Sequence, residues 1–228
     1  GCSTKDINLE EKELKKSNFK KIETKYFDLE NQYIIFALEA ENQRLFYDAK
    51  EAYLKLFEKT NNYEYFVKYL SIATQLKEYA AVKEKVLKYS IKNIEEEETI
   101  LRIYTFSLFK LQEKEESILN AIKLVSLYNN SVNYELLGSI YFEDKQYIKA
   151  YESFNNAFTL NDSSNTLLTL TNIQFYSLSQ KNEAIKRLED YIQINEYNFN
   201  LSIQLLTFYE ELKAKDKILL FLKNMFYY

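Results

Sequence analysis

The sequence predicts an all-α protein made of about six helix-turn-helix repeats behind a leading N-terminal helix. Its 228 residues include only two Gly and no Pro, whereas an antiparallel β protein normally uses both residues in its turns. A composition of 46% hydrophobic and 28% charged residues is enough for a buried core with a charged surface. Apolar residues also recur with a period near 34 residues, which is typical of tandem helical repeats.

The composition excludes several classes of function. With no His and a single Cys, the chain lacks the usual zinc ligands and any Ser-His or Cys-His nucleophile pair. Gly1 and Gly138 are the only glycines, so a glycine-rich phosphate loop cannot form. The net charge is −4, with 30 basic residues interleaved among 34 acidic ones, and this pattern does not attract nucleic acid. We therefore expect no catalysis, no metal or other cofactor, and no nucleic-acid partner.

Residues 1–8 are interpreted as a tether. Cys2 is the only cysteine and is followed by Ser3 and Thr4, and this start resembles the end of a bacterial lipobox, where a small residue precedes a lipid-modified Cys. The resemblance implies a lipid on Cys2 and, because Ser follows the Cys, a place on the outer membrane facing the periplasm. An accidental terminal thiol is the alternative, and Gly1 is either a native residue or a tag remnant.

Residues 9–29 are strongly charged but carry apolar residues at roughly helical spacing. These residues are Leu14, Phe19, Ile22, Tyr26 and Leu29. We expect one helix that packs on the first repeat as a half-repeat. A mobile charged linker from the anchor is the alternative.

Residues 30–228 contain three columns of residues that define the repeats, with positions counted from the first residue of each repeat. Position 20 is small or aliphatic and recurs at intervals of 33, 35, 33, 34 and 34, at Ala49, Val82, Ser117, Ala150, Ala184 and Ile218. Position 24 holds Tyr53, Val86, Ala121, Phe154, Leu188 and Leu222. Position 11 holds Ala40, Ala73, Leu108, Tyr141, Phe175 and Tyr209. The predicted repeats span 30–62, 63–97, 98–130, 131–164, 165–198 and 199–228.

The fourth repeat resembles a tetratricopeptide repeat (TPR). It places an aromatic residue, Leu-Gly, Tyr, Ala, an aromatic residue and Ala at positions 4, 7, 8, 11, 20, 24 and 27. These residues are Tyr134, Leu137, Gly138, Tyr141, Ala150, Phe154 and Ala157. The resemblance implies a right-handed superhelical solenoid over residues 30–228. Leu-Gly occurs only in this repeat, and the family's usual Pro at position 32 is absent throughout.

Polar residues are expected to start the helices in place of that proline. Asn61, Asn129, Asp162 and their polar neighbours occupy the stretch, where such side chains can cap the next helix. Asn93 with Glu96 reads as a capping box. The acidic run at residues 95–98 is accordingly interpreted as the start of a helix rather than a cation site.

The resemblance also implies a concave face lined by the first helix of every repeat. The candidate peptide-groove residues are Arg102, Phe106, Phe109, Glu135, Phe142, Ile173 and Tyr176. This mixed aromatic and polar set favours an extended or helical peptide over a clamp for a C-terminal carboxylate, which needs several converging cations. The alternative is that Phe106, Phe109 and Phe142 pack between neighbouring helices.

The segment 218–228 is apolar or aromatic at nine of its eleven positions. Not all of these side chains can face the core of one helix. We expect Leu219, Leu220, Phe226 and Tyr227 to form a C-terminal interface with a partner or a second copy of the chain. The alternative is that the final turns curl back and cover themselves.

These features predict a lipid-anchored periplasmic scaffold that binds other envelope proteins through its concave face and its C-terminal end. The alternative is a self-assembling structural subunit of an envelope, flagellar or pilus complex. A remote alternative is a glycoside hydrolase that uses paired carboxylates, with Glu135 near Glu143 or Glu210 beside Glu211.

Overall fold

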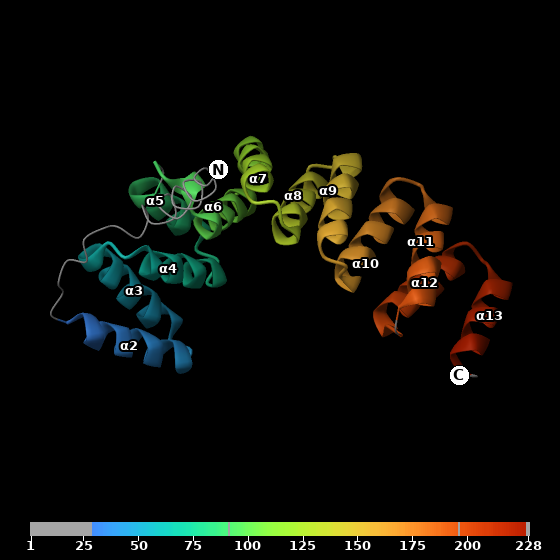
Figure 1. Ribbon diagram of the computed structural model, residues 1–228, viewed down its shortest axis with the longest axis horizontal. Coiled ribbons are helices and arrows are strands. Elements are labelled where there is room, and N and C mark those ends of the chain that lie inside the picture. Colours follow the sequence, from blue (N-terminus) through green and yellow to red (C-terminus); the bar gives the residue numbers. More distant parts are fainter. Residues whose placement is uncertain (1–28, 91, 196, 227–228) are drawn as a thin grey trace, which may run out of the picture. The chain divides into compact units, whose positions relative to one another are not determined.

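The computed structural model describes residues 29–90, 92–195 and 197–226. These residues contain twelve α-helices and no strand, so the predicted all-α repeat fold is confirmed (Figure 1). The helices are α2 (Glu30–Asn42), α3 (Phe46–Thr60), α4 (Tyr63–Gln75), α5 (Tyr79–Tyr89), α6 (Glu98–Lys110), α7 (Lys114–Leu127), α8 (Ser131–Glu143), α9 (Tyr147–Leu160), α10 (Ser164–Asn172), α11 (Lys181–Ile194), α12 (Phe199–Glu211) and α13 (Lys215–Phe226). A 3₁₀ turn (Ile94–Glu96) precedes α6, and a π-helical turn (Ile173–Ser177) follows α10. The predicted leading helix lies outside the described residues, apart from Leu29.

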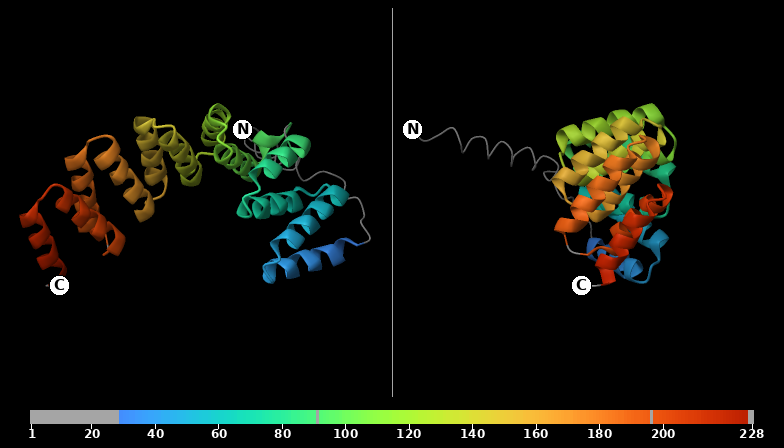
Figure 2. Two further views of the ribbon diagram at one scale, coloured as in Figure 1. Left: turned by 180° about the vertical axis from the view of Figure 1, so that it is seen from behind. Right: turned by 90° about the vertical axis from the view of Figure 1, so that its right-hand side faces the viewer.

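The chain divides into two compact units, Gly1–Asn120 (unit 1) and Ala121–Tyr228 (unit 2), and the boundary falls within α7. Within unit 1, α3 packs against both α2 and α4, and α5 packs against α6. Within unit 2, α8 packs against α9 and α11 packs against α12. Figure 2 shows the helices from two further sides. The two helices of a repeat pack against each other in the pairs α2–α3, α4–α5, α8–α9, α10–α11 and α12–α13, and α4, α6, α10 and α12 also pack against the second helix of the preceding repeat. Among the described residues, no helix has both the length and the apolar character needed to cross a membrane.

The three columns found in the sequence form the core of the helix pairs. At position 20, the first five residues are at most 1% exposed, while Ile218 is partly exposed. At position 11, all six residues are between 0% and 8% exposed. Small residues at position 20 lie where two antiparallel helices cross closely, and the larger residues fill the space beside the crossing. The 34-residue period is therefore a packing requirement repeated along the chain.

The turn between the two helices of each repeat has the same backbone form six times. One residue per turn adopts a left-handed conformation with φ between 55° and 63°, at Arg44, Lys77, Gln112, Lys145, Ser179 and Lys213. The next N–H usually bonds back to the position-11 carbonyl, as from Leu45 to Ala40 (2.8 Å) and from Glu78 to Ala73 (2.9 Å). This bond closes a Schellman-type helix end. The turns therefore form without glycine, which is consistent with the composition of the chain.

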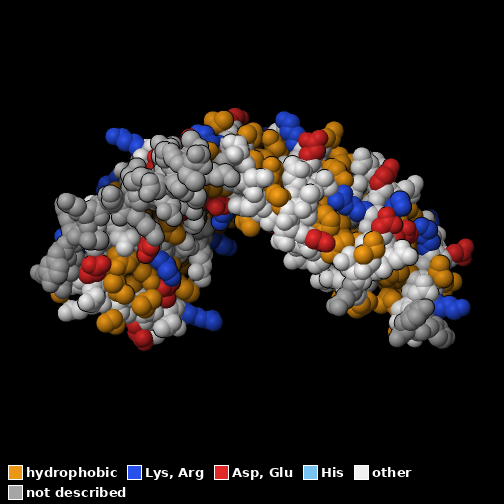
Figure 3. All heavy atoms as spheres, in the orientation of Figure 1, with side chains coloured by type: hydrophobic (Ala, Val, Ile, Leu, Met, Phe, Trp, Pro, Cys, Tyr) orange, Lys and Arg blue, Asp and Glu red, His pale blue; other side chains and the backbone are white. Residues whose placement is uncertain are grey.

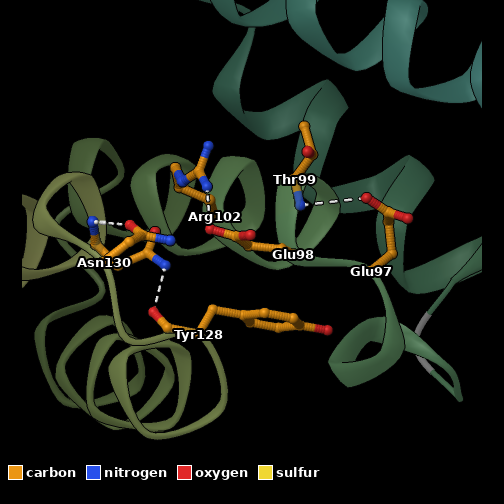
Figure 4. Close-up of polar contacts among 7 residues, drawn as sticks. Glu97, Glu98, Thr99, Arg102, Tyr128 and Asn130 are labelled. Carbon is orange, nitrogen blue, oxygen red and sulfur yellow. Dashed lines mark hydrogen bonds and ion pairs between the residues drawn. The ribbon is translucent and has the colours of Figure 1, made fainter. Parts of the chain in front are cut away.

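Asparagine caps several of the first helices, as expected from the missing proline. The Asn62, Asn130 and Asn198 side chains accept hydrogen bonds from backbone N–H groups in the first turns of α4, α8 and α12. The expected capping box at Asn93 and Glu96 is wrong. Because residues 94–96 form the 3₁₀ turn, α6 begins later, and Glu97 caps it by accepting from the Thr99 N–H at 3.4 Å (Figure 4).

Candidate functional site

The candidate site residues of the third repeat lie on α6. The Arg102 guanidinium pairs with Glu98 one turn earlier, and both side chains are half-buried (Figure 4). The Phe106 ring meets the Tyr79 ring edge-on with centroids 5.8 Å apart. Lys110 Nζ lies 5.2 Å from the centroid of Phe106. Since Glu98 offsets the charge of Arg102, the exposed cation of this group is Lys110, held over aromatic rings.

Phe109 joins the same group on α6. Its ring centroid lies 5.1 Å from Lys110 Nζ, and its side chain is half-buried. Phe106 and Phe109 therefore each divide their surface between the helix packing and solvent.

In the fourth repeat, Glu135 and Phe142 differ in their surroundings. Glu135 Oε1 accepts a hydrogen bond from Thr166 Oγ1 at 2.5 Å, and Thr166 is buried. That bond links α8 to α10, so Glu135 has a structural partner. Phe142 is 41% exposed, and its ring centroid lies 5.4 Å from that of Tyr147. Phe142 therefore presents an aromatic surface to solvent.

In the fifth repeat, Tyr176 is 53% exposed. Its ring packs edge-on against Phe175 at 4.9 Å and against Phe208 at 5.9 Å between centroids. Partial burial, together with the nearby Glu211 carboxylate, raises the pKa of the Tyr176 hydroxyl, which therefore stays protonated. Tyr176 and Phe142 both occupy position 12 of their repeats, so adjacent repeats each expose one ring at the same register.

Ile173 does not belong to the exposed face, and its assignment to the groove is wrong. Its side chain is only 2% exposed. The π-helical turn at Ile173–Ser177 contains one extra residue. In the other repeats, the N–H at position 16 bonds to the carbonyl at position 11, five residues earlier, whereas the Gln180 N–H bonds to Gln174 O, six residues earlier, at 2.8 Å. The residues before this turn are therefore shifted by one, and Ile173 takes the buried place that Ile72 and Ile140 hold in the second and fourth repeats.

The predicted C-terminal residues lie on α13, the helix with no buried residue among those described. Leu219, Leu220 and Phe226 are 66%, 61% and 81% exposed. Ile218 and Phe221 pack against the core of the fifth and sixth repeats, so one side of α13 is attached while the other is open. Tyr227 and Cys2 lie outside the described residues.

The carboxylates do not gather into a metal site, because the described part of the chain contains no group of three Asp, Glu, Cys or His side chains that could hold an ion. Glu210 and Glu211 are exposed at the end of α12. Glu135, the other carboxylate considered for hydrolysis, is engaged by Thr166.

One surface feature was missed in the sequence. A hollow of about 390 Å³ is lined by Lys145, Gln146, Tyr147, Ile148, Lys149 and Leu178. Ile148 is 67% exposed there. One indication of this hollow was present in the sequence, because residues 147 and 148 are adjacent and apolar. When two neighbours at the start of an amphipathic helix are both apolar, one of them remains exposed.

No protein-family model and no curated protein matches the sequence. Solved structures of TPR proteins do match the fold. A TPR protein from Parabacteroides merdae has a TM-score of 0.66 and 13% identity over 88% of this chain and 80% of that chain. The pilF protein of Pseudomonas aeruginosa has a TM-score of 0.60 and 18% identity over 87% and 92%. MamA from Desulfovibrio magneticus RS-1 has a TM-score of 0.61 and 17% identity over 74% and 96%. At these identities the likeness concerns the fold, and the described helices have the fold of TPR proteins.

Proposed function

We propose that this chain is a non-enzymatic interaction scaffold that binds a polypeptide along the first-helix side of its repeats. The observation that carries the proposal is the exposure of Phe142 and Tyr176 at position 12 of two adjacent repeats. Aromatic side chains are enriched where a few residues supply most of the binding energy at an interface. Two exposed rings in matching register suit a ligand with apolar side chains at a regular spacing, such as an extended or helical peptide.

The surroundings of the rings favour a polar as well as an apolar contact with that peptide. In unit 2, position 12 of the sixth repeat is Glu210, which is exposed. A peptide along this face of unit 2 would meet two rings followed by a carboxylate, which suits apolar side chains followed by a basic one. In unit 1, the cation of Lys110 over Phe106 and Phe109 suits an acidic side chain.

The proposed location is the bacterial envelope, with a lipid on Cys2 that holds the chain at the outer membrane on the periplasmic side. The support is the run Gly1-Cys2-Ser3-Thr4, which resembles a bacterial lipobox, and the presence of a single cysteine in the sequence. Mass spectrometry of the mature N-terminus from the native host tests the lipid. A free, unmodified thiol on the mature protein would contradict it.

The binding proposal is tested with Phe142→Ala combined with Tyr176→Ala. Because both rings are largely exposed, we expect capture of a cross-linked envelope partner to fall at least about tenfold while the melting temperature moves by less than about 2 °C. The matched control is Ile148→Ala with Ile194→Ala, two exposed side chains on second helices of unit 2 (67% and 82%). Equal loss in both variants, or a large drop in melting temperature, would overturn the assignment of the two rings.

A self-assembling structural subunit is the second candidate function. Its support is the open side of α13, with Leu219, Leu220 and Phe226 exposed. Light scattering of the purified protein should then show a dimer or a larger species that Leu220→Glu with Phe226→Glu dissociates. A monomer at high concentration would remove this candidate and leave the scaffold.

A further inference from the structure

Helix α2 lacks the cover that the first helices of the later repeats have. Its position-7 residue, Phe36, is 54% exposed. In four later repeats the position-7 side chain is between 1% and 6% exposed, at Tyr69, Tyr104, Leu137 and Leu205. These helices lie beside the second helix of a preceding repeat, and the described residues contain no helix before α2. The open side of α2 is therefore the side on which a second helix would pack.

Helix α13 has the pattern of a second helix whose outer side is uncovered. When it is aligned with α3 at position 20, an apolar residue falls at each of the first six places that α3 buries. These residues are Ile218, Leu219, Phe221, Leu222, Met225 and Phe226. Leu219 and Phe226 are 66% and 81% exposed, and they correspond to Lys50 and Phe57, the two residues of α3 that contact the next repeat.

Three kinds of side-chain contact link a second helix to the repeat that follows it. They join position 21 to position 16, position 25 to position 19, and position 28 to position 4. The observed pairs are Lys50 with Glu78 (2.6 Å) and Lys83 with Glu113 (2.5 Å), then Glu189 with Lys217 (3.0 Å), and finally Phe57 with Phe66, whose ring centroids are 4.6 Å apart. The three positions of a second helix therefore need residues of matching chemistry on the next repeat.

The first two of these contacts match between α13 and the first repeat. Position 21 of the last repeat is Leu219 and position 16 of the first repeat is Leu45, and both are exposed apolar residues. Position 25 is Lys223 and position 19 is Asp48, which are both exposed and have opposite charges. An apolar pair and an ion pair thus replace the contacts that join successive repeats inside the chain.

The third contact is matched by an aromatic pair and by the shape of the surface. Position 28 of the last repeat is Phe226, and position 4 of the first repeat is Tyr33. Tyr33 borders a hollow of about 310 Å³ whose other described lining residues are Gln32 and Phe36. Hydrophobic side chains gather at the surface of the end of unit 1 that α2 and α3 form (Figure 3). The Phe226 ring is therefore matched by aromatic rings beside a hollow.

The segment that precedes α2 in the chain fits the open side of α2 less well. Residues 12–26 correspond to α3 at a shift of 34, and they have Lys15, Asn18 and Glu23 where α3 buries Ala49, Ala52 and Phe57. At the same three places α13 has only apolar residues. This difference favours the linker interpretation of residues 9–29 over a half-repeat.

We propose that α13 of one copy packs on the open side of α2 of a second copy, as α3 packs on α4, so that copies of the chain associate head to tail. The inference rests on the self-assembly candidate above, whereas peptide binding at Phe142 and Tyr176 does not depend on it. A contact between two different surfaces leaves α2 open on one copy and α13 open on the other, so assembly continues beyond a dimer. A two-fold contact between two α13 helices stops at a dimer.

Two blocked variants of the full chain separate these arrangements. Both carry Cys2→Ser, so that no disulfide can join two copies. The α13-blocked variant has Leu219→Glu with Phe226→Glu, and the α2-blocked variant has Phe36→Glu with Leu45→Glu. Because the four replaced side chains are at least 48% exposed, both variants should keep the melting temperature of the parent protein.

Analytical ultracentrifugation at high micromolar concentration measures the assembly. We expect the parent protein with Cys2→Ser to form species larger than a dimer and each blocked variant to be a monomer by itself. An equimolar mixture of the two variants should form a dimer of one copy of each and grow no further, because each variant supplies the surface that the other lacks. The matched control, Ile148→Glu with Ile194→Glu, changes exposed residues on α9 and α11 and should assemble like the parent.

The outcomes distinguish this arrangement from self-assembly in general. Dimers of the α2-blocked variant by itself would show a two-fold contact through α13, and dimers of the α13-blocked variant by itself would show a contact through α2. Either result, or a mixture that stays monomeric while the parent assembles, would overturn the head-to-tail arrangement and leave self-assembly standing. A monomeric parent protein would overturn both.

The ion pair gives a second readout that keeps the apolar surfaces intact. Lys223→Glu should weaken association about threefold, because the new carboxylate faces Asp48 of the next copy. Adding Asp48→Lys to the same chain should restore the affinity, since every contact then has one Glu and one Lys again. Unchanged association of Lys223→Glu, or no recovery in the double variant, would contradict the register of the contact.

Discussion

The second and fourth repeats fill the space between position 8 of the first helix and position 24 of the second helix with residues of opposite sizes. In the second repeat, position 8 is Leu70 and position 24 is Val86, and both are fully buried. In the fourth repeat, position 8 is Gly138, and a Cβ placed there would lie 2.8 Å from two ring atoms of Phe154 at position 24. A large residue on the first helix is matched by a smaller one on the second, and a glycine is matched by a phenylalanine. In these two repeats a change of size at one position accompanies the opposite change at the other, which keeps the space between the helices filled.

The first repeat follows the same rule, with Ala37 at position 8 and Tyr53 at position 24. These residues are 0% and 3% exposed. The comparison explains why Leu-Gly occurs in a single repeat although the period continues through all six. Substitutions at one position should therefore be rescued by an opposite change at the other.

The largest effect is expected from Leu70→Ala in the second repeat. Removing this fully buried side chain should lower the free energy of unfolding by about 2–5 kcal/mol, because a cavity remains between the helices. Urea denaturation measures the loss. Adding Val86→Phe should recover part of it, since this change gives the second repeat the small-and-aromatic pairing of the fourth. A double variant no more stable than Leu70→Ala would refute the exchange of volume.

The reverse change, Gly138→Leu, is expected to cost up to about 3 kcal/mol. The new side chain has no room beside the Phe154 ring, and overpacking in a core typically costs 1–3 kcal/mol. Phe154→Val in the same protein converts the pair to Leu and Val, as in the second repeat, and should restore most of the stability. Unchanged stability of Gly138→Leu by itself would show that the ring can move aside at no cost.

Two ion pairs between successive repeats of unit 1 are less exposed than the pair of Lys217 and Glu189 between the fifth and sixth repeats, whose side chains are 55% and 35% exposed. Lys50 pairs with Glu78 at 2.6 Å, and Lys83 pairs with Glu113 at 2.5 Å. The Lys50 side chain is 9% exposed. Lys50→Met should therefore lower the free energy of unfolding by about 1 kcal/mol, which is more than the loss of an exposed ion pair causes. Lys186→Met in unit 2 is the control, because Lys186 and Asp190 are 75% and 58% exposed and such pairs contribute about 0.3–0.5 kcal/mol. Equal costs would mean that burial adds nothing to the Lys50 pair.

The smallest effect concerns alkaline pH. Burial, with nearby carboxylates, raises the pKa of Tyr65 and of Tyr69 to about 12, and the same causes raise the pKa of Tyr53 and of Tyr104. A folded pKa above the ordinary value of about 10 gives stability that is complete below pH 10 and is lost as the pH rises toward 12. In unit 2, burial and the nearby Glu189 raise the pKa of Tyr209, and the pKa values of Tyr141, Tyr176 and Tyr191 are raised as well.

We therefore expect unit 1 to lose hydrogen-exchange protection before unit 2 between pH 10 and pH 12. Tyrosine absorbance should rise over the same range. Tyr69→Phe should reduce the pH dependence of unit 1. If unit 2 lost its hydrogen-exchange protection at a lower pH than unit 1, the prediction would be wrong.

The helix pairs could be predicted from the sequence because their packing repeats. Every pair needs a small residue at the crossing and larger apolar residues at positions 11 and 24, so the same pattern of residue types returns about every 34 residues. The exposed C-terminal residues Leu219 and Leu220 were also predictable, since one helix buries only one side.

Other features depended on the tertiary structure. The extra residue in the π-helical turn leaves the composition of the fifth repeat unchanged but moves Ile173 from the expected surface into the core. The bond from Thr166 to Glu135 joins residues 31 apart in sequence, and no local pattern predicts it. Residue types and spacing determined the repeat, because packing at each crossing depends on volume and polarity. The site residues that reach solvent were decided only in three dimensions, because exposure depends on where a neighbouring helix lies.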